Sequence, residues 1–459
     1  MMKVKIHKKL TTWQVLSLGY FLVIITGTVL LGLPFATKDG ENTSLVNALF
    51  TSTSATCVTG LVPYDTNTHW SVFGQIVILL LIQLGGLGFM TIVTLLFRLI
   101  GKHISMGQQK ILMASAGEGH RNEMRRLFKR ILIGTLLFEG LGAMLLSVRF
   151  CNQFGTGKGV YYAVFHSVSA FCNAGFDLMG GVFGGEKFVS LTAYATDPLV
   201  SLTIAFLILI GGVGFCVWDD LLEKRFRYKK LLLHTKIVLM MTLILIVVPT
   251  AMFLFFERGN PDYAGYTFGE RTLVAFFSAV TPRTAGFNTV DLSPGTFSDS
   301  SYLLTLMLMF VGGSSGSTAG GIKITTFFII LVGMVSVFRG KRDIELGKRR
   351  LHQSVLRQAL AVFVSCLLIV LTATLLLCTF ERDNSAATLQ AVLFETFSAM
   401  GTVGLSLSLT PTLCAASKIV LVLLMYAGRV GIITLGLAFA ERKDTATLKK
   451  PVDNSVLIG

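Results

Sequence analysis

The hydrophobic residues of this chain form four copies of one pattern. In each copy a long apolar run is followed by a short amphipathic stretch, a glycine-containing segment and a second long apolar run. The first runs cover residues 13–33, 131–148, 236–256 and 358–379, and the second runs cover residues 72–98, 199–218, 302–338 and 416–440. Apolar runs of this length can cross a bilayer as helices. The pattern therefore predicts eight transmembrane helices.

The amphipathic stretches are too short to cross a membrane. They cover residues 44–56, 160–171, 270–281 and 387–400. We expect each to be a re-entrant pore helix, followed by an extended segment that returns to the side it came from. The predicted fold class is an all-α integral membrane protein of four M1–pore helix–M2 repeats with pseudo-fourfold symmetry. The four predicted repeats, with their connections, are residues 1–99, 100–218, 219–338 and 339–459.

The glycine-containing segments share a frame, which we call the glycine frame: a phenylalanine, a serine or threonine two residues later, and a glycine ten residues after the phenylalanine. The four glycine frames are Phe50–Ser52–Gly60, Phe165–Ser167–Gly175, Phe276–Ser278–Gly286 and Phe394–Thr396–Gly404. Glycine also helps membrane helices to pack closely. However, the glycine frame occurs at the same place in all four repeats, which favours a shared function over close helix packing alone.

Composition and charge support a membrane protein with a defined orientation. The chain is 53% hydrophobic and 14% charged, which is far from the average of soluble domains. Of its 40 Lys and Arg residues, 29 lie at 3–9, 98–130, 224–236, 339–357 and 442–450. By the positive-inside rule these regions are cytoplasmic, as are both termini. The net charge of +15 then reflects topology and requires no nucleic-acid partner. The basic connections could also dock a cytosolic protein or anionic lipid.

Irregular backbone at membrane depth is tolerated where it is buried in protein or lines a water-filled cavity. Four such segments around one axis would form rings of carbonyl oxygens, which can replace the hydration shell of an alkali cation. Glycine suits this role because it readily adopts positive φ. The predicted ion-binding residues are Val58, Thr59, Gly60, Asn173, Ala174, Gly175, Thr284, Ala285, Gly286, Thr402, Val403 and Gly404.

The second run of the third repeat contains a segment rich in small residues at 312–321. Because glycine disfavours helix by about 1 kcal/mol relative to alanine, we expect an intramembrane loop here rather than a merely kinked helix. In the fourth repeat, Arg429 replaces the glycine found at Gly86 and Gly212. It is predicted to be either a barrier in the conduction path or a structural tie to loop carbonyls or to a carboxylate such as Glu139 or Glu395. The predicted gate residues are Gly312, Gly313, Gly316, Ser317, Thr318, Gly320, Gly321, Lys323 and Arg429.

Other polar residues also lie inside the predicted membrane region, and among them Glu139, in the first span of the second repeat, is expected to have a packing or pairing role. His166 and Glu395 each follow the phenylalanine of a glycine frame, and we expect them to brace the frame rather than to relay protons. Arg283 precedes the third frame's Thr284-Ala285-Gly286, where the other repeats have Cys57, Cys172 and Gly401. Its role is left open.

With these motifs, nearly the whole chain resembles the membrane subunit of the Ktr/Trk/HKT superfamily of potassium transporters, and most closely the bacterial KtrB type. The resemblance implies a plasma-membrane, multi-pass potassium uptake protein with potassium at the filter carbonyls, a gating loop at 312–321 and an arginine beneath the filter. It further implies a homodimer and a cytosolic nucleotide-binding regulatory ring of the RCK/KTN type. Sodium as a coupling or activating ion is left open.

Two other function classes are considered. A secondary transporter that binds another cation or a small solute with broken helices usually has inverted or paired repeats, which fit four parallel repeats poorly. A membrane-embedded enzyme would need a cluster of catalytic side chains, and the predicted spans contain no such cluster. We therefore expect a transporter and not an enzyme.

Overall fold

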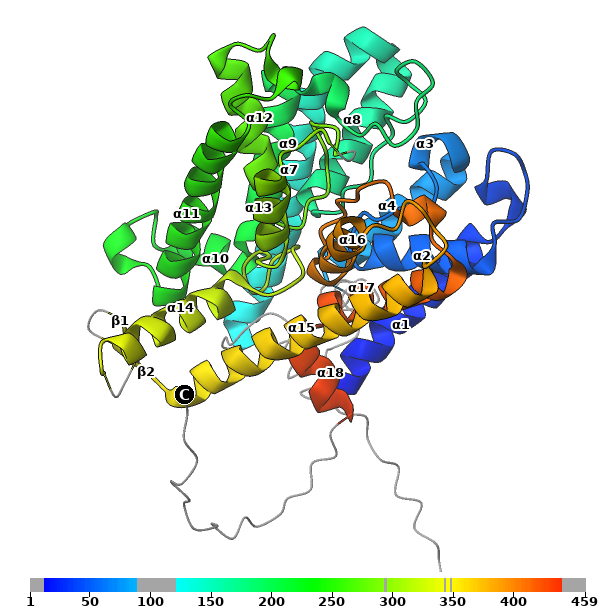
Figure 1. Cartoon of the computed structure of the whole chain (residues 1–459). Helices are drawn as coiled ribbons and strands as arrows, with labels where there is room; N and C mark the ends of the chain where they lie inside the picture. The colour runs from blue at the N-terminus through cyan, green and yellow to red at the C-terminus, as the bar shows by residue number, and fades with distance from the viewer. Residues whose placement is uncertain (1–11, 89–120, 293–294, 342–343, 347–348, 440–459) are drawn as a thin grey trace, which may run out of the picture.

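The computed structural model describes residues 12–88, 121–292, 295–341, 344–346 and 349–439, and it is mostly helical (Figure 1). The α-helices are α1 Thr12–Leu31, α2 Leu45–Thr56, α3 Thr66–His69, α4 Val72–Gly86, α7 Arg121–Phe154, α8 Thr156–Phe171, α9 Pro198–Val213, α10 Phe215–Glu223, α11 Leu233–Phe256, α12 Phe268–Val280, α13 Asp299–Met309, α14 Ile324–Phe338, α15 Gln353–Phe380, α16 Leu389–Gly401, α17 Ala415–Val430 and α18 Ile432–Phe439. The 3₁₀ helices are Pro34–Ala36, Thr192–Tyr194, Tyr228–Lys230, Pro261–Tyr263 and Thr410–Thr412.

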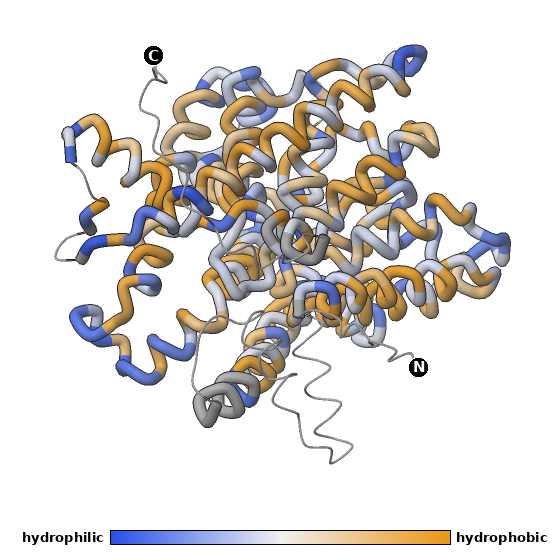
Figure 2. Tube along the Cα trace, turned by 90° about the horizontal axis from the view of Figure 1, so that it is seen from below, coloured by the Kyte–Doolittle hydropathy of each residue, from blue (hydrophilic) through white to orange (hydrophobic). Residues whose placement is uncertain are grey.

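Among the described residues, four helices are long and apolar enough to cross a membrane: Trp13–Leu31, Lys129–Phe154, Leu233–Phe256 and Gln353–Phe380. A fifth candidate is the pair α9 and α10, which is bent by 87°. In Figure 2 the helices of the chain are mainly hydrophobic, and the strongly hydrophilic residues lie mostly at helix ends and in connections. The mostly helical fold and the four first spans therefore match the prediction, whereas the count of eight crossings stays a prediction.

The second spans are interrupted more often than predicted. A loop was expected in the third repeat only, but the helix also breaks at Gly214 between α9 and α10 and at Gly431 between α17 and α18. Both glycines have positive φ, +103° and +88°, which a residue with a Cβ rarely adopts. Gly88, the matching glycine after α4, has φ +81°. Three second spans contain a Gly-x-x-Gly sequence, at 85–88, 211–214 and 428–431, and in each the helix ends just before the last glycine.

The four short helices occur where the pattern predicted them, as α2, α8, α12 and α16. Three of them begin at a side-chain cap, because Ser44, Thr267 and Thr388 accept backbone N–H groups of the first turn. Each short helix packs against the long first helix of its own repeat. The framing phenylalanines Phe50, Phe165 and Phe394 are at most 1% exposed, so they anchor these helices in the core.

The hydroxyl of the glycine frame ties the short helix to the first helix in three of the four repeats. The Ser52 hydroxyl donates to the Ile24 carbonyl of α1 (2.7 Å), and the Ser167 hydroxyl donates to the Glu139 carbonyl of α7 (2.6 Å). In the fourth repeat, Thr396 is hydrogen-bonded to Thr374 of α15 (2.9 Å). Hydrogen bonds between membrane helices contribute about 0.6 kcal/mol each to stability. Because this contribution is small, their main effect here is to fix the position of each short helix along the first helix.

A β-hairpin was not foreseen in the basic connection before the fourth repeat. Strands β1 Ile344–Leu346 and β2 Arg349–Leu351 pair antiparallel, with Ile344 opposite Leu351 (Figure 1). Ile344 is buried, whereas Glu345 and Arg350 are exposed. The hairpin therefore stiffens a connection that the sequence suggested only as a basic loop.

Candidate functional site

After each short helix the backbone takes the same unusual conformation. The residue two positions before each frame glycine has positive φ: Val58 (+56°), Asn173 (+58°), Thr284 (+69°) and Thr402 (+52°). The four frame glycines also have positive φ, between +70° and +94°. Non-glycine residues rarely adopt this region, and four at matching positions show that the repeats share one backbone path.

The four frame glycines meet in a closed ring. A Cβ on Gly60 would lie 2.6 Å from the Ala174 carbonyl oxygen, one on Gly175 would lie 2.7 Å from that of Ala285, and one on Gly286 would lie 2.6 Å from that of Val403. The ring closes because a Cβ on Gly404 would collide with the Thr59 carbonyl oxygen. Each glycine therefore makes room for the carbonyl that precedes the glycine of the next repeat.

Hydroxyl groups in the short helices, or directly after them, hydrogen-bond to the backbone of the ring segments. The amides of Gly60 and Gly404 donate to the hydroxyls of Ser54 (3.1 Å) and Ser398 (3.0 Å). In the other two repeats the Ser169 hydroxyl donates to the Phe176 carbonyl (2.7 Å), and Thr281 donates to the Phe287 carbonyl (2.6 Å). These four supports were not predicted, although their recurrence five or six residues before each glycine was visible in the sequence.

His166 and Glu395 both hydrogen-bond to the chain beyond the ring. The ring nitrogens of His166 contact the Tyr162 carbonyl (2.7 Å) and the Leu178 amide (3.3 Å), so Nδ1 donates and Nε2 accepts. The Glu395 carboxylate accepts a hydrogen bond from the Thr410 hydroxyl. Both contacts join a short helix to the segment that follows its glycine, as expected of braces.

A cavity of about 490 Å³ lies on one side of the ring, lined by the four frame glycines and the segments that follow them. Its charged lining residues are three acids, Asp177, Glu186 and Asp291, and one base, Lys187. Acidic groups in a recess raise the local cation concentration. These acids were not predicted, because they lie in two separate connections, Asp177 and Glu186 after α8 and Asp291 after α12.

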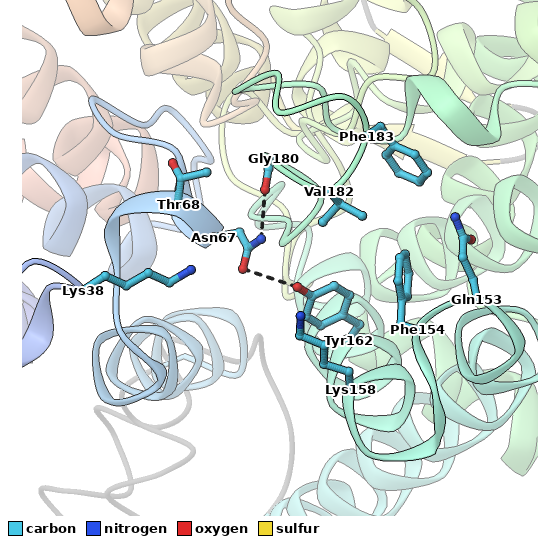
Figure 3. A pocket seen from close by; sticks show the side chains of 11 residues that line it. Lys38, Asn67, Thr68, Gln153, Phe154, Lys158, Tyr162, Gly180, Val182 and Phe183 are labelled. Atoms are coloured by element: carbon cyan, nitrogen blue, oxygen red, sulfur yellow. Dashed lines mark hydrogen bonds between the residues drawn. The ribbon is translucent and has the colours of Figure 1, made fainter.

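A larger cavity, of about 660 Å³, lies off this axis between the first and second repeats (Figure 3). Asn67 of α3 links the two repeats, since its amide donates to the Gly180 carbonyl (2.8 Å) and its oxygen accepts from Tyr162 of α8 (3.4 Å). The charged residues that line this cavity are Lys38 and Lys158. Two lysines repel cations, so size alone does not make this cavity part of a cation pathway.

The small-residue segment of the third repeat forms an irregular loop between α13 and α14. Its two ends are paired, because the Gly312 amide donates to the Ile322 carbonyl (2.8 Å) and the Ile324 amide donates to the Gly313 carbonyl (3.0 Å). The interruption expected at 312–321 is therefore confirmed. Lys323 donates to the carbonyls of Ala319 (2.8 Å) and Gly320 (3.2 Å), so its ammonium group stabilises the loop itself.

This loop lies against the ring on the side opposite the acidic cavity. The Thr318 hydroxyl lies 3.2 Å from both the Phe171 carbonyl and the Asn173 Oδ1 atom, at the point where the second ring segment begins. A Cβ on Gly320 would collide with the Thr402 side chain, and one on Gly321 would lie 2.9 Å from the Gly401 carbonyl oxygen. The loop therefore contacts both the second and the fourth segments.

Arg429 joins the loop to the first repeat. Its guanidinium donates to the Thr318 carbonyl and to the carbonyls of Gly85 and Gly86. Of the partners predicted for a structural tie, loop carbonyls or a carboxylate, the contacts are to carbonyls, one in the loop and two in α4. Glu139 instead accepts from the Gln83 amide (3.0 Å). Arg429 thus carries a positive charge beneath the ring and ties together elements far apart in the sequence.

Arg283 is only 4% exposed, and its guanidinium lies 3.4 Å from the Thr242 hydroxyl. Its carbonyl accepts from the Asn173 side chain (3.2 Å), which links the second and third segments. The side chain therefore packs behind the third segment, between it and α11.

The arrangement described above is that of a multi-pass membrane protein whose repeats enclose a ring of backbone carbonyls. The sequence model of the family described as "TrkH: Cation transport protein" matches residues 14–449. The chain belongs to this family of cation transporters. The resemblance noted from the sequence is confirmed.

Individual relatives agree with this assignment. The potassium/sodium uptake protein NtpJ of Enterococcus hirae is 39% identical, with 100% of this chain and 99% of that protein covered. The Ktr system potassium uptake protein B of Bacillus subtilis is 39% identical, with 95% of each chain covered. Among solved structures, the potassium transporter TrkH from Vibrio parahaemolyticus superposes with a TM-score of 0.74 at 18% identity, covering 96% of this chain and 87% of that one.

Proposed function

We propose that this protein takes up potassium through the ring of four glycine frames, with the ion coordinated by the backbone carbonyls of the predicted ion-binding residues. The observation that carries the proposal is the closed ring, in which every frame glycine faces the carbonyl of the next repeat. Rings of carbonyls can replace the hydration shell of potassium. The buried hydroxyls of Thr59 and Thr402, which lack a partner among the described residues, add oxygen atoms of the same kind.

Sodium is the second candidate ion. Its support is the name of the Enterococcus hirae relative, a potassium/sodium uptake protein. Sodium could share the pathway or act as a coupling or activating ion. Against free sodium permeation, all four frames carry glycine, which the superfamily resemblance associates with potassium.

The loop at 312–321 is proposed as the gate. It covers the ring on the side opposite the acidic cavity and contacts Asn173 and Thr402. Arg429 contributes a positive charge below the ring and holds the closed loop through Thr318. An ion that leaves the ring would meet both the loop and this charge.

Regulation by a separate cytosolic subunit is part of the proposal. The Bacillus subtilis relative is named as protein B of a Ktr system, which supports a multi-component assembly. The proposed partner is a nucleotide-binding ring of the RCK/KTN type, and the proposed membrane unit is a homodimer. The basic connections at 98–130, 224–236 and 339–357 would face the cytoplasm together with both termini. The first of them lies mainly outside the described residues.

Tracer rubidium uptake into liposomes that contain the purified chain would test the proposal. Uptake is expected to be inhibited by potassium, and far less by sodium, lithium or choline. Equal inhibition by sodium and potassium would contradict potassium selectivity. If the chain alone gives no uptake, the measurement is repeated with the regulatory ring added, and absence of uptake in both conditions would contradict a transport function.

Removing the charge of Arg429 should increase basal uptake. Arg429→Gln keeps hydrogen-bonding capacity but removes the positive charge and weakens the tie to Thr318 and Gly85. We expect uptake without a partner to rise about tenfold, which corresponds to ~1.4 kcal/mol of barrier. Arg339→Gln, at an exposed position after α14, is the matched control. Unchanged uptake by folded Arg429→Gln would leave Arg429 with a purely structural role.

A further inference from the structure

A cavity of about 340 Å³ lies between the end of α11 and the beginning of α12, away from the proposed ion pathway. Its inner wall includes Phe253, Val274, Ala275 and Phe297, each no more than 7% exposed. At its mouth, Phe268 is 79% exposed. An apolar recess beside an exposed aromatic residue suits a hydrocarbon chain, because both surfaces gain from apolar contact.

In the other three repeats, a hydrogen bond joins the hydroxyl residue of the glycine frame to the first helix. In the third repeat, the cavity lies at this position. Ser278 is the hydroxyl residue of the third glycine frame and lines the cavity. In the described part of the chain it has no hydrogen-bond partner, whereas Ser52 and Ser167 are tied to α1 and α7. The third repeat has therefore lost the contact that closes the short helix against the first helix, and a cavity has opened instead.

Two arginines stand at the cavity, Arg258 after α11 and Arg271 in the first turn of α12. The Arg271 guanidinium is positioned by donating to the carbonyls of Tyr266 (3.1 Å) and Ala264 (3.4 Å). Neither arginine has an ion-pair partner among the residues that the structure describes.

The single carboxylate of the cavity, Glu257, is engaged elsewhere. It accepts hydrogen bonds from the amide (3.0 Å) and hydroxyl (2.7 Å) of Ser298 and from the side chain of Asn260 (2.7 Å). Both of its oxygens are therefore occupied, and the two guanidinium groups are available to an external anion. Arginine binds phosphate through paired N–H groups.

We propose that this cavity binds one anionic phospholipid, with an acyl chain between α11 and α12 and the phosphate at Arg258 and Arg271. The site lies outside the proposed ion pathway and its occupancy does not depend on transport. The bound acyl chain would also lie next to residues that pack against the third ring segment. Ser278 and Phe297 line both this cavity and a smaller one, which Asn288 and Thr289 also line. The lipid composition of the membrane could therefore affect the packing of the third ring segment.

The fourth repeat supplies a matched control. Glu381 and Arg382 follow α15 as Glu257 and Arg258 follow α11, and Glu381 likewise accepts hydrogen bonds from Cys414 (2.7 Å) and Asn384 (2.9 Å). In that repeat, however, Thr396 and Thr374 are hydrogen-bonded across the helix pair. Arg382 is thus an exposed arginine in the same sequence context that does not line this cavity.

Native mass spectrometry of the purified full chain, titrated with phosphatidylglycerol or phosphatidylcholine, would test the proposal. We expect one phosphatidylglycerol to be retained at least tenfold more strongly than phosphatidylcholine. Arg258→Ala combined with Arg271→Ala should remove this preference, whereas Arg382→Ala should retain it. Ala275→Leu, which fills the cavity, should weaken retention of both lipids.

Three results would overturn the proposal. One is unchanged lipid retention in the double arginine variant. Another is full competition by free glycerol phosphate, which would show an anion site without a lipid chain. The third is a change in oligomeric state in Ala275→Leu with normal lipid retention, because the cavity would then belong to a contact between copies. Since lipid mass is measured directly, absence of ion uptake does not affect the outcome.

Discussion

Gly60→Ser is expected to reduce the preference for potassium over sodium by at least about tenfold, or ~1.4 kcal/mol. Gly60 has φ +94°, and a Cβ there would lie 2.6 Å from the Ala174 carbonyl oxygen and 3.3 Å from the Cα atoms of Gly175 and Gly404. The added atom must therefore push a neighbouring segment aside, and the contacted atoms are all backbone. A distorted ring can no longer match the size of a dehydrated potassium ion.

The measurement is rubidium uptake into liposomes at increasing sodium and potassium concentrations, compared with the unmodified chain. Gly140→Ser is the matched control, because Gly140 lies in α7 with open space around its Cα. It should leave both uptake and ion preference unchanged. If Gly60→Ser folds and discriminates between the ions as before, the first segment has no part in selectivity.

The position of the ring segments could be predicted from sequence because their determinants are local. The predicted short helix at 387–400 corresponds to α16, Leu389–Gly401, and the segment after it turns at Thr402 and Gly404. Apolar runs set the helices, and glycine sets the turns. Four copies of the same order of elements then reinforce each assignment.

The contacts between repeats could not be predicted, because they depend on how distant segments pack. Arg429 meets Thr318 and Gly85, which are 111 and 344 residues away in sequence. No local pattern distinguishes these carbonyls from a carboxylate. Likewise, Ser278 matches its counterparts in sequence, but its missing hydrogen bond is visible only once α11 and α12 are placed.

The helix breaks at Gly214 and Gly431 could be predicted only in part from the sequence. Their sequence repeat was visible, but glycine is also common inside membrane helices, so the pattern did not indicate a turn by itself. In the structure a Cβ on Gly214 would lie 3.1 Å from Ser314 Oγ and from the Ser315 carbonyl oxygen. The bend in the second repeat therefore accommodates the loop of the third, which explains why both features occur together.

Shortening the loop should raise the rate of uptake without changing ion preference. Because Gly312 and Gly313 are already paired with Ile322 and Ile324, deletion of residues 314–319 can join the two ends without displacing α13 or α14. The deletion removes Thr318 and with it the contacts to Asn173 and Arg429. We expect uptake by the chain alone to rise at least about tenfold, since opening rather than ion binding would limit the rate.

Two comparisons make this prediction specific. Replacing residues 314–319 by six alternating serine and glycine residues keeps the length and should leave uptake low, if the loop acts by occupying the space beneath the ring. Thr318→Val keeps the volume but removes the hydroxyl contacts to Phe171 and Asn173, and its uptake should lie between those of the intact chain and the deletion. A folded deletion with low uptake would mean that the loop is only a break in the helix. A faster deletion that also lost its preference for potassium would mean that the loop supports the ring itself, so that gate and filter are not separate parts.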